Sequence, residues 1–272
     1  MRFKIELMKT FMNKTGKQNV PPVTLLCILI MAIFIIHAPN AFAAPISLAV
    51  MGDNYDQSFN TLASSGSSSS LPPGWAMNKT TYTAGPGSSS AGGMKSYGPT
   101  GNIDRALGSL TNDVGTLIYG AEFQNNTGMS INFLDISYTG EQWRKGTSTA
   151  VDTLFFQYSL NATSLTDSLA TWVSVSSLNF VSPKHDGVAG SLNGNLIANR
   201  ASPSAQISGL NISDSSIFWI RWNDLDIPSF TDHGLAIDDF NLTPTQVPVP
   251  GAILLLSSGL IGLAGLRWRF RK

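Results

Sequence analysis

Five aspartates near the C-terminal end of the chain have the chemistry of a cation site. They fall within 16 residues, at positions Asp224, Asp226, Asp232, Asp238 and Asp239. Carboxylates with nearby carbonyl oxygens are the ligands that a hard cation such as Ca²⁺ prefers. The pattern therefore indicates a calcium site with Asp224, Asp226, Asp238 and Asp239 as ligands. The spacing is not that of an EF-hand, so a second interpretation stays open, in which the acids cap turns and solvate the surface.

The segment "GEQWR" has the residue types of a sugar-binding site, with Glu141, Trp143 and Arg144 as candidate ligand contacts. Sugar sites combine an aromatic platform with polar groups that make paired hydrogen bonds. Trp75 and Trp219 are further candidate platforms. The alternative is that the tryptophans close the core or its edges, and that Glu141 and Arg144 make structural hydrogen bonds.

Catalytic motifs are missing from residues 44–246. The two histidines there, His185 and His233, lie in turn-rich segments and near no nucleophile motif such as Gly-x-Ser-x-Gly. A glycosidase needs two carboxyl groups across a cleft, but Glu122 and Glu141 are the only glutamates and the aspartates form no motif. The sequence predicts a protein without catalytic residues and without a cofactor other than Ca²⁺.

The charge of the central segment argues against nucleic-acid binding. Residues 44–246 contain eight Lys and Arg against sixteen Asp and Glu, which gives a net charge of about −8. Nucleic-acid binding requires a basic face, so nucleic acid is not a predicted partner. The only cysteine is Cys27, outside this segment, so the segment contains no disulfide.

The N-terminal segment has the three parts of a secretory signal. Residues 1–22 carry five cations and one acid, and the apolar run Val23–Ile36 follows. The tripeptide "AFA" then ends at Ala43 and fits the pattern that signal peptidase accepts. We expect residues 1–43 to form a signal helix that is cut between Ala43 and Ala44. A helix that stays uncut is the alternative, although the apolar run is short for a membrane span.

Residues 44–246 have the pattern of one all-β domain. The segments "TLIYGAEF", "NFLDISY", "DTLFFQYSL" and "SIFWIRWNDL" alternate apolar and polar residues between turn-forming stretches. Many short strands without helices predict a single β-sandwich that is jelly-roll-like. Residues 63–101 are rich in Gly and Ser, and we expect long surface loops there that aromatic anchors tie to the sandwich.

The segment "HGLAIDDFNLT" contains an irregularity that predicts a β-bulge. Leu235 and Ile237 share one parity along the strand, whereas Phe240 and Leu242 have the other. One extra residue at Asp238-Asp239 would return all four side chains to one face. Burial on both faces of the strand is the alternative.

Several segments in order resemble a β-sandwich module of bacterial exported and surface proteins. They include "YDQSFNTLASSG", "SYGPTGNIDRALGSL", "YTGEQWR", "FWIRWNDLD" and "DHGLAIDDFNLT", and the resemblance covers about residues 48–243. The module is also similar to an accessory region beside the catalytic domain of some extracellular nucleases. The resemblance implies a fold and a compartment rather than a reaction.

The C-terminal segment, residues 247–272, is "VPVPGAILLLSSGLIGLAGLRWRFRK". Residues 251–266 are uncharged and predict a short transmembrane helix of about 24 Å. The cations that follow would hold the end in the cytoplasm by the positive-inside rule. These cations are Arg267, Arg269, Arg271 and Lys272.

This segment resembles the PEP-CTERM sorting signal, which consists of a Pro-Glu-Pro motif, an apolar span and a basic end. Pro248 and Pro250 match the motif, and Val249 stands where the family usually has Glu. The resemblance implies processing near the motif by an exosortase, a membrane transpeptidase. It also implies a Gram-negative source and a link to exopolysaccharide and biofilm matrix.

Together these features predict a non-catalytic protein of the cell surface or extracellular matrix. It would cross the inner membrane and be anchored there, transiently or permanently, by one C-terminal helix. Its predicted partners are signal peptidase, an exosortase-like enzyme and exopolysaccharide. Two alternatives stay open: a membrane-anchored ectodomain that is never processed, and a secreted hydrolase acting on polysaccharide or nucleic acid.

Overall fold

The computed structural model describes residues 44–226 and 231–247. The predicted signal peptide, the residues Pro248, Val249 and Pro250, the predicted span and the basic end lie outside the described residues, so these predictions stay predictions. Within the described part of the chain, no helix has the length and apolarity needed to cross a membrane.

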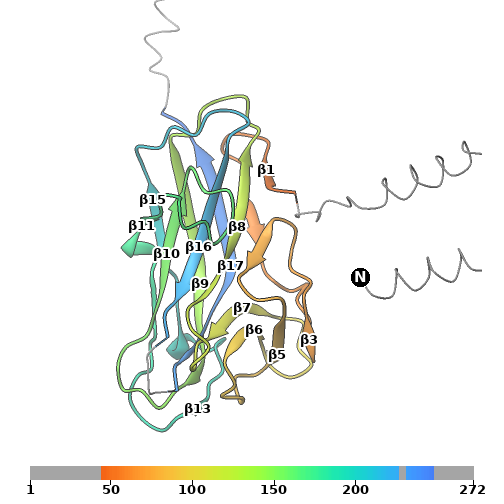
Figure 1. Ribbon diagram of the computed structural model, residues 1–272, viewed down its shortest axis with the longest axis vertical. Helices are drawn as coiled ribbons and strands as arrows, with labels where there is room; N and C mark the ends of the chain where they lie inside the picture. Colours follow the sequence, from red (N-terminus) through yellow and green to blue (C-terminus); the bar gives the residue numbers. More distant parts are fainter. Residues whose placement is uncertain (1–43, 227–230, 248–272) are drawn as a thin grey trace, which may run out of the picture. The chain divides into compact units, whose positions relative to one another are not determined.

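Two β-sheets make up the domain, as predicted for an all-β sandwich (Figure 1). Sheet A has seven strands. They are β1 (Ile46–Leu48), β4 (Trp75–Met77), β8 (Leu117–Asn125), β10 (Thr153–Ser159), β11 (Val173–Ser174), β12 (Phe180–Val181) and β16 (Ile217–Asp224). Two short 3₁₀ helices, η1 (Ser176–Leu178) and η2 (Ile197–Asn199), are the only helical elements of the described ranges.

Sheet B has ten strands. They are β2 (Tyr55–Gln57), β3 (Ser67–Ser68), β5 (Tyr82–Gly85), β6 (Gly93–Tyr97), β7 (Ala106–Leu110), β9 (Phe133–Lys145), β13 (Gly190–Ser191), β14 (Arg200–Ala201), β15 (Ser204–Ile207) and β17 (Gly234–Thr245). The long strands β9 and β17 pair antiparallel at its centre. Each sheet has one parallel pair of strands among the described residues: β1 with β8 in sheet A, and β5 with β6 in sheet B.

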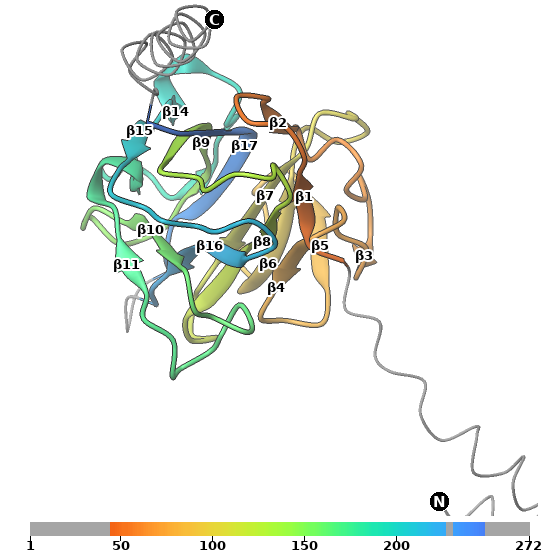
Figure 2. The same cartoon turned by 90° about the horizontal axis from the view of Figure 1, so that it is seen from above.

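The core lies between the two sheets, which form separate layers when seen from above (Figure 2). Its centre is Trp222, a fully buried side chain of β16 in sheet A. The Trp222 ring meets Phe240 of sheet B edge-on, with 5.7 Å between centroids, and stacks on Trp75 at 6.0 Å. Buried aromatics contribute large apolar areas and directional contacts, so this cluster joins the sheets.

Strand β17 contains the predicted bulge. Asp238 pairs with Thr139 and Asn241 pairs with Ser137, so β17 has one residue more than β9 between these two pairs. Asp239 adopts a left-handed backbone with φ of 46°. As a result, apolar side chains on both sides of the bulge enter the core: Leu235, Ile237, Phe240 and Leu242. The bulge is confirmed. The alternative also holds for the first half of the strand, because the outward-facing Ala236 and Asp238 are buried as well.

The Gly- and Ser-rich segment 63–101 is more ordered than predicted. It contributes β4 to sheet A, and β3, β5 and β6 to sheet B. Trp75, Tyr82 and Tyr97 are buried, so the predicted aromatic anchors are confirmed, but the prediction of loops alone is wrong. Composition misleads here because strand pairing satisfies the backbone even where Ser and Gly dominate.

The outward side of the β9–β17 pair positions the candidate site. Side chains alternate between the faces of a strand, and Leu134, Ile136 and Tyr138 of β9 enter the core. Asp135, Ser137, Glu141 and Trp143 therefore point away from the core. On β17 the bulge places Asp238, Asn241 and Thr243 on this same outward side. We call it the outer face of sheet B.

Candidate functional site

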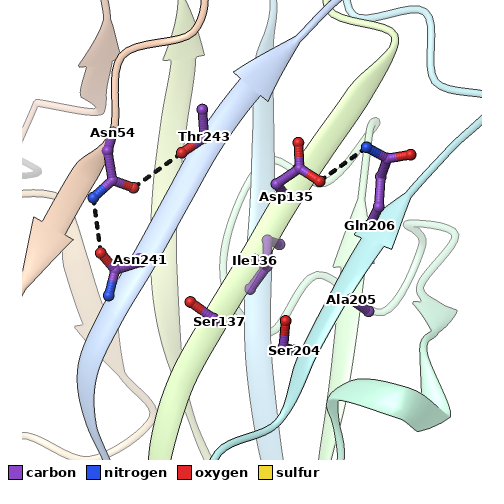
Figure 3. A pocket seen from close by; sticks show the side chains of 9 residues that line it. All are labelled: Asn54, Asp135, Ile136, Ser137, Ser204, Ala205, Gln206, Asn241 and Thr243. Carbon is purple, nitrogen blue, oxygen red and sulfur yellow. Dashed lines mark hydrogen bonds between the residues drawn. The ribbon is translucent and has the colours of Figure 1, made fainter.

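A polar groove of about 410 Å³ lies on the outer face of sheet B. Strands β9 and β17 form its floor, and β15 and the turn before β2 form its sides (Figure 3). Its lining residues are Asn54, Asp135, Ile136, Ser137, Ser204, Ala205, Gln206, Asn241 and Thr243. Seven of these nine side chains carry hydrogen-bonding groups. We call this feature the β9–β17 groove.

One side of the groove is held by the side chain of Asn54. Its amide group donates to Asn241 Oδ1 at 2.7 Å, and its carbonyl oxygen accepts from Thr243 Oγ1 at 3.0 Å (Figure 3). The same amide also donates to Asp56 Oδ1 at 2.5 Å. Asn54 thus fixes the orientation of two β17 side chains that line the groove.

The other side is held by Asp135 and Gln206. Gln206 Nε2 donates to Asp135 Oδ1 at 2.9 Å (Figure 3), and Thr245 Oγ1 donates to Asp135 Oδ2 at 3.3 Å. Ser137 and Ser204 lie between the two sides. The groove therefore presents oriented amides, hydroxyls and one carboxylate. Among its lining residues there is no Lys, Arg or His.

A group of acidic side chains lies farther along the same face. Glu141 and Asp238 are 2% and 4% exposed, and Asp104 and Asp239 interact with both. Burial raises the pKa of Glu141 to about 7, although the Trp143 hydrogen bond opposes this rise. Burial also raises the pKa of Asp238 to about 9, and the nearby Glu141 charge contributes to that rise. Both carboxyl groups thus resist ionisation at neutral pH.

The candidate sugar contacts Glu141, Trp143 and Arg144 do not form an open platform. Trp143 is 2% exposed, its indole Nε1 donates to Glu141 Oε2 at 2.8 Å, and its ring stacks on Tyr97. Arg144 Nη1 donates to the backbone carbonyls of Gly87 and Ser88. These contacts fit the structural interpretation of the three residues, and Trp143 presents no open ring face to a sugar.

The other two candidate platforms are also covered. Trp75 is 4% exposed in the main core, and Trp219 is 7% exposed in a small apolar cluster with Leu165. Trp75 lies between the two sheets, against Trp222 and Phe240. Trp219 lies on the other side of sheet A, where Ala162 and Leu165 pack against it.

The four predicted calcium ligands separate into two places. The carboxyl of Asp224 at the end of β16 interacts with Asp226 and with Asp152, whereas Asp238 interacts with Asp239, Glu141 and Asp104. Among the described residues, no three Asp, Glu, His or Cys side chains are grouped so that they could hold a metal ion. The residues fit a four-carboxylate calcium site poorly, and calcium binding stays an untested prediction.

Asp224 belongs to a buried polar cluster at one end of the sandwich. It is fully buried, and its Oδ2 accepts from Ser109 Oγ at 2.6 Å. Burial and the neighbouring Asp152 raise the pKa of Asp224 well above its ordinary range, and burial raises that of Asp152 to about 7. His233 lies in the same region, where its Nδ1 accepts from Gly146 N. The side chains of this cluster are buried, so they are not exposed to a dissolved substrate.

The sequence pattern did not identify the groove. Asn54 and Gln206 lie on short elements, and 152 residues separate them along the chain. They meet because β2 pairs with β17 and β15 pairs with β9. The one available signal was that Asp135 and Ser137 are the polar residues of the predicted strand "NFLDISY".

Comparison with known proteins gives only distant likeness. No protein-family model matches the chain, and no curated protein matches it. Among solved structures, TmCBM61 in complex with β-1,4-galactotriose is 10% identical, with a TM-score of 0.27 over 53% of this chain and 74% of that chain.

A second structure contains the CBM22-1 and GH10 modules of Clostridium thermocellum endo-1,4-β-D-xylanase 10B with xylohexaose. It is 11% identical, with a TM-score of 0.33 over 74% of this chain and 29% of that chain. At TM-scores below 0.5, neither likeness identifies a ligand for this chain.

Proposed function

We propose that this chain is an exported, non-catalytic β-sandwich protein that binds a glycan in the β9–β17 groove. The observation that carries the proposal is the lining of the groove, in which seven side chains offer hydrogen-bonding groups and hydrogen bonds already orient several of them.

Glycan hydroxyls both donate and accept hydrogen bonds, and the groove offers both functions. The amides of Gln206 and Asn241 contain a donor and an acceptor each, and the hydroxyls of Ser137 and Ser204 can act as either. Because Asn54 holds Asn241 and Asp135 holds Gln206, these two amides lose little side-chain freedom when a ligand binds. Polar groups at fixed positions give a site its orientation and specificity.

If the chain were a hydrolase, its two catalytic carboxyl groups would have to come from a pair such as Glu141 and Asp238. A glycosidase places two carboxyls on either side of a substrate-filled cleft. Both side chains are almost fully buried, and Glu141 Oε2 already accepts from the Trp143 indole. This geometry supports a binding function over hydrolysis.

Export and sorting complete the proposal. The chain would be cut after Ala43, sorted by an exosortase-like enzyme near Pro248–Pro250, and placed in the exopolysaccharide or biofilm matrix of a Gram-negative bacterium. The end of the folded domain supports such processing, because it lies just before the motif. Strand β17 ends at Thr245, and Val247 N donates to Asn132 Oδ1. A cut near Pro248–Pro250 would leave both sheets intact.

A glycan array tests the binding function. Both sheets and the core lie within residues 44–247, so this fragment is the protein to use. We expect it to retain at least one polysaccharide class, and Asn241→Ala to weaken the signal. The control Asn211→Ala changes an exposed asparagine outside the groove and should leave binding intact. Turnover of a bound glycan, lost in Glu141→Gln or Asp238→Asn, would instead support the hydrolase.

A further inference from the structure

The charge of the β9–β17 groove is entirely negative. Asp135 is its only charged lining residue, and none of the eight Lys and Arg of residues 44–246 lines it. The rim adds further negative charge, because Asp56 accepts from the amide of Asn54, and Asp239 precedes the lining residue Asn241 by two positions. A ligand in this groove therefore meets carboxylates without a compensating protein cation.

Several cations of the two sheets have contacts outside the groove. Arg200 of β14 lies opposite Glu141 rather than opposite the groove floor. Arg144 donates to the carbonyls of Gly87 and Ser88, and the Lys145 ammonium donates to the carbonyls of Gly146 and Ser148. Arg221 belongs to sheet A, where it contacts Gln157 and the Trp172 ring.

This arrangement discriminates between classes of glycan. A polymer with carboxylate or sulfate groups would place negative charges beside Asp135. The repulsion between like charges lowers the affinity for such a polymer and so contributes to specificity. A protonated amine has three donors and no acceptor. Each oxygen of Asp135 accepts one hydrogen bond from a protein side chain, and a carboxylate oxygen has capacity for a second. Ser137 and Ser204 offer hydroxyl acceptors nearby.

Building on the proposed function, we infer that the preferred ligand is a glycan with free amino groups. Its chemical class is a polymer that contains deacetylated hexosamine. Its ammonium groups lie against Asp135, while its hydroxyls bond to the amides on both sides of the groove. Neutral glycans fit the same hydrogen bonds but lack the charge contact, and uronic-acid polymers are repelled.

Calorimetry with defined oligosaccharides tests this inference on residues 44–247. The probes are glucosamine oligomers, N-acetylglucosamine oligomers of the same length, and oligogalacturonate. We expect the free-amine oligomer to bind about tenfold more tightly than its acetylated counterpart, as one charged hydrogen bond predicts. Oligogalacturonate should bind more weakly than either, and the tenfold preference should shrink as salt is added.

Two matched variants separate a site from general attraction to an acidic protein. Asp135→Asn removes the charge but keeps an acceptor for Gln206, so we expect it to abolish the preference for the free amine while acetylated oligomers still bind. Asp186→Asn changes an exposed carboxylate outside the groove and should keep the preference. If Asp135→Asn keeps the preference, or if both oligomers bind equally in the wild type, the inference is wrong.

The results also distinguish this inference from the proposed function. Binding of neutral glycans that is lost in Asn241→Ala, without any preference for amines, would overturn the inference and leave the function standing. Binding of no glycan at all would overturn both.

Discussion

The indole N–H of Trp143 donates to Glu141 Oε2 at 2.8 Å, and the two residues lie two positions apart on β9. Both side chains point to the outer face of sheet B, yet chain segments cover both. Gly87 and Gly194 make this cover possible, because a Cβ at either position would collide with Trp143. The contact stabilises the fold and closes that part of the face to ligands.

Trp143→Phe tests the structural assignment of this pair. The variant keeps a ring beside Tyr97 but leaves the buried Glu141 without its donor, so we expect the free energy of unfolding to fall by about 1–3 kcal/mol. Urea unfolding at pH 7 measures this loss. Glycan binding should not change, and a folded variant that no longer binds glycan would show that Trp143 belongs to the ligand site.

The bulge in β17 gives a second prediction. Asp239 has a φ of 46°, a conformation that glycine adopts without strain and β-branched residues adopt poorly. We expect Asp239→Val to destabilise the domain by about 1–2 kcal/mol, whereas Asp239→Gly should be close to neutral. Thermal unfolding of both variants is the measurement. Equal melting temperatures would show that β17 does not need the left-handed residue.

The pH dependence of stability follows from Asp238. The pKa of its carboxyl rises from an ordinary 3.8 to about 9 on folding, chiefly through burial. Between about pH 4 and pH 9 the folded state then holds more protons than the unfolded state, so the free energy of unfolding falls as pH rises. Asp152 and Glu141, each with a pKa raised by burial to about 7, act in the same direction up to about pH 7.

His233 changes the free energy of unfolding in the opposite direction, over a narrower pH range. Burial lowers its pKa from 6.5 to about 4, so its contribution to stability is lost as pH falls through that interval. Because the acids outnumber it, we expect the domain to be less stable at pH 8 than at pH 5. Asp238→Asn should raise the free energy of unfolding at pH 8 by more than about 1 kcal/mol, and the gain should shrink toward pH 4. A gain of the same size at both pH values would contradict the assignment to Asp238.

Calcium is tested by melting residues 44–247 with Ca²⁺ and with a chelator. The described side chains form no group of three metal-binding residues, so we expect the melting temperature to change little. If Ca²⁺ instead raises the melting temperature, the variant that removes this rise, Asp224→Asn or Asp238→Asn, shows which acidic group holds the ion. That result would support the prediction made from the sequence.

Sorting is tested by mass spectrometry of the mature protein from its native cell. We expect an N-terminus at Ala44 and a C-terminus near Pro248–Pro250. Intact Lys272 on the surface-exposed protein would contradict processing and support the permanently anchored ectodomain.

The sequence predicted the features that depend on local parity. The alternation in "NFLDISY" assigned Leu134, Ile136 and Tyr138 to the core, and the change of parity around Asp238-Asp239 predicted the bulge. It failed where distant segments meet. Burial of Trp143 depends on Gly87 and Gly194, and the groove depends on pairing of β2 and β15 with the central strands. No local pattern contains that information, because long-range strand register is set by the whole fold.

The central claim is that the β9–β17 groove binds glycan, and blocking the groove tests it most directly. Ser204 is an exposed lining residue of β15, so Ser204→Trp would fill the groove without entering the core. Ser191→Trp, at an exposed position of β13 in the same sheet, is the matched control. With the best glycan from the array, calorimetry should show binding to the wild type and the control, and at least tenfold weaker binding to Ser204→Trp. Equal affinity in all three proteins would contradict the claim.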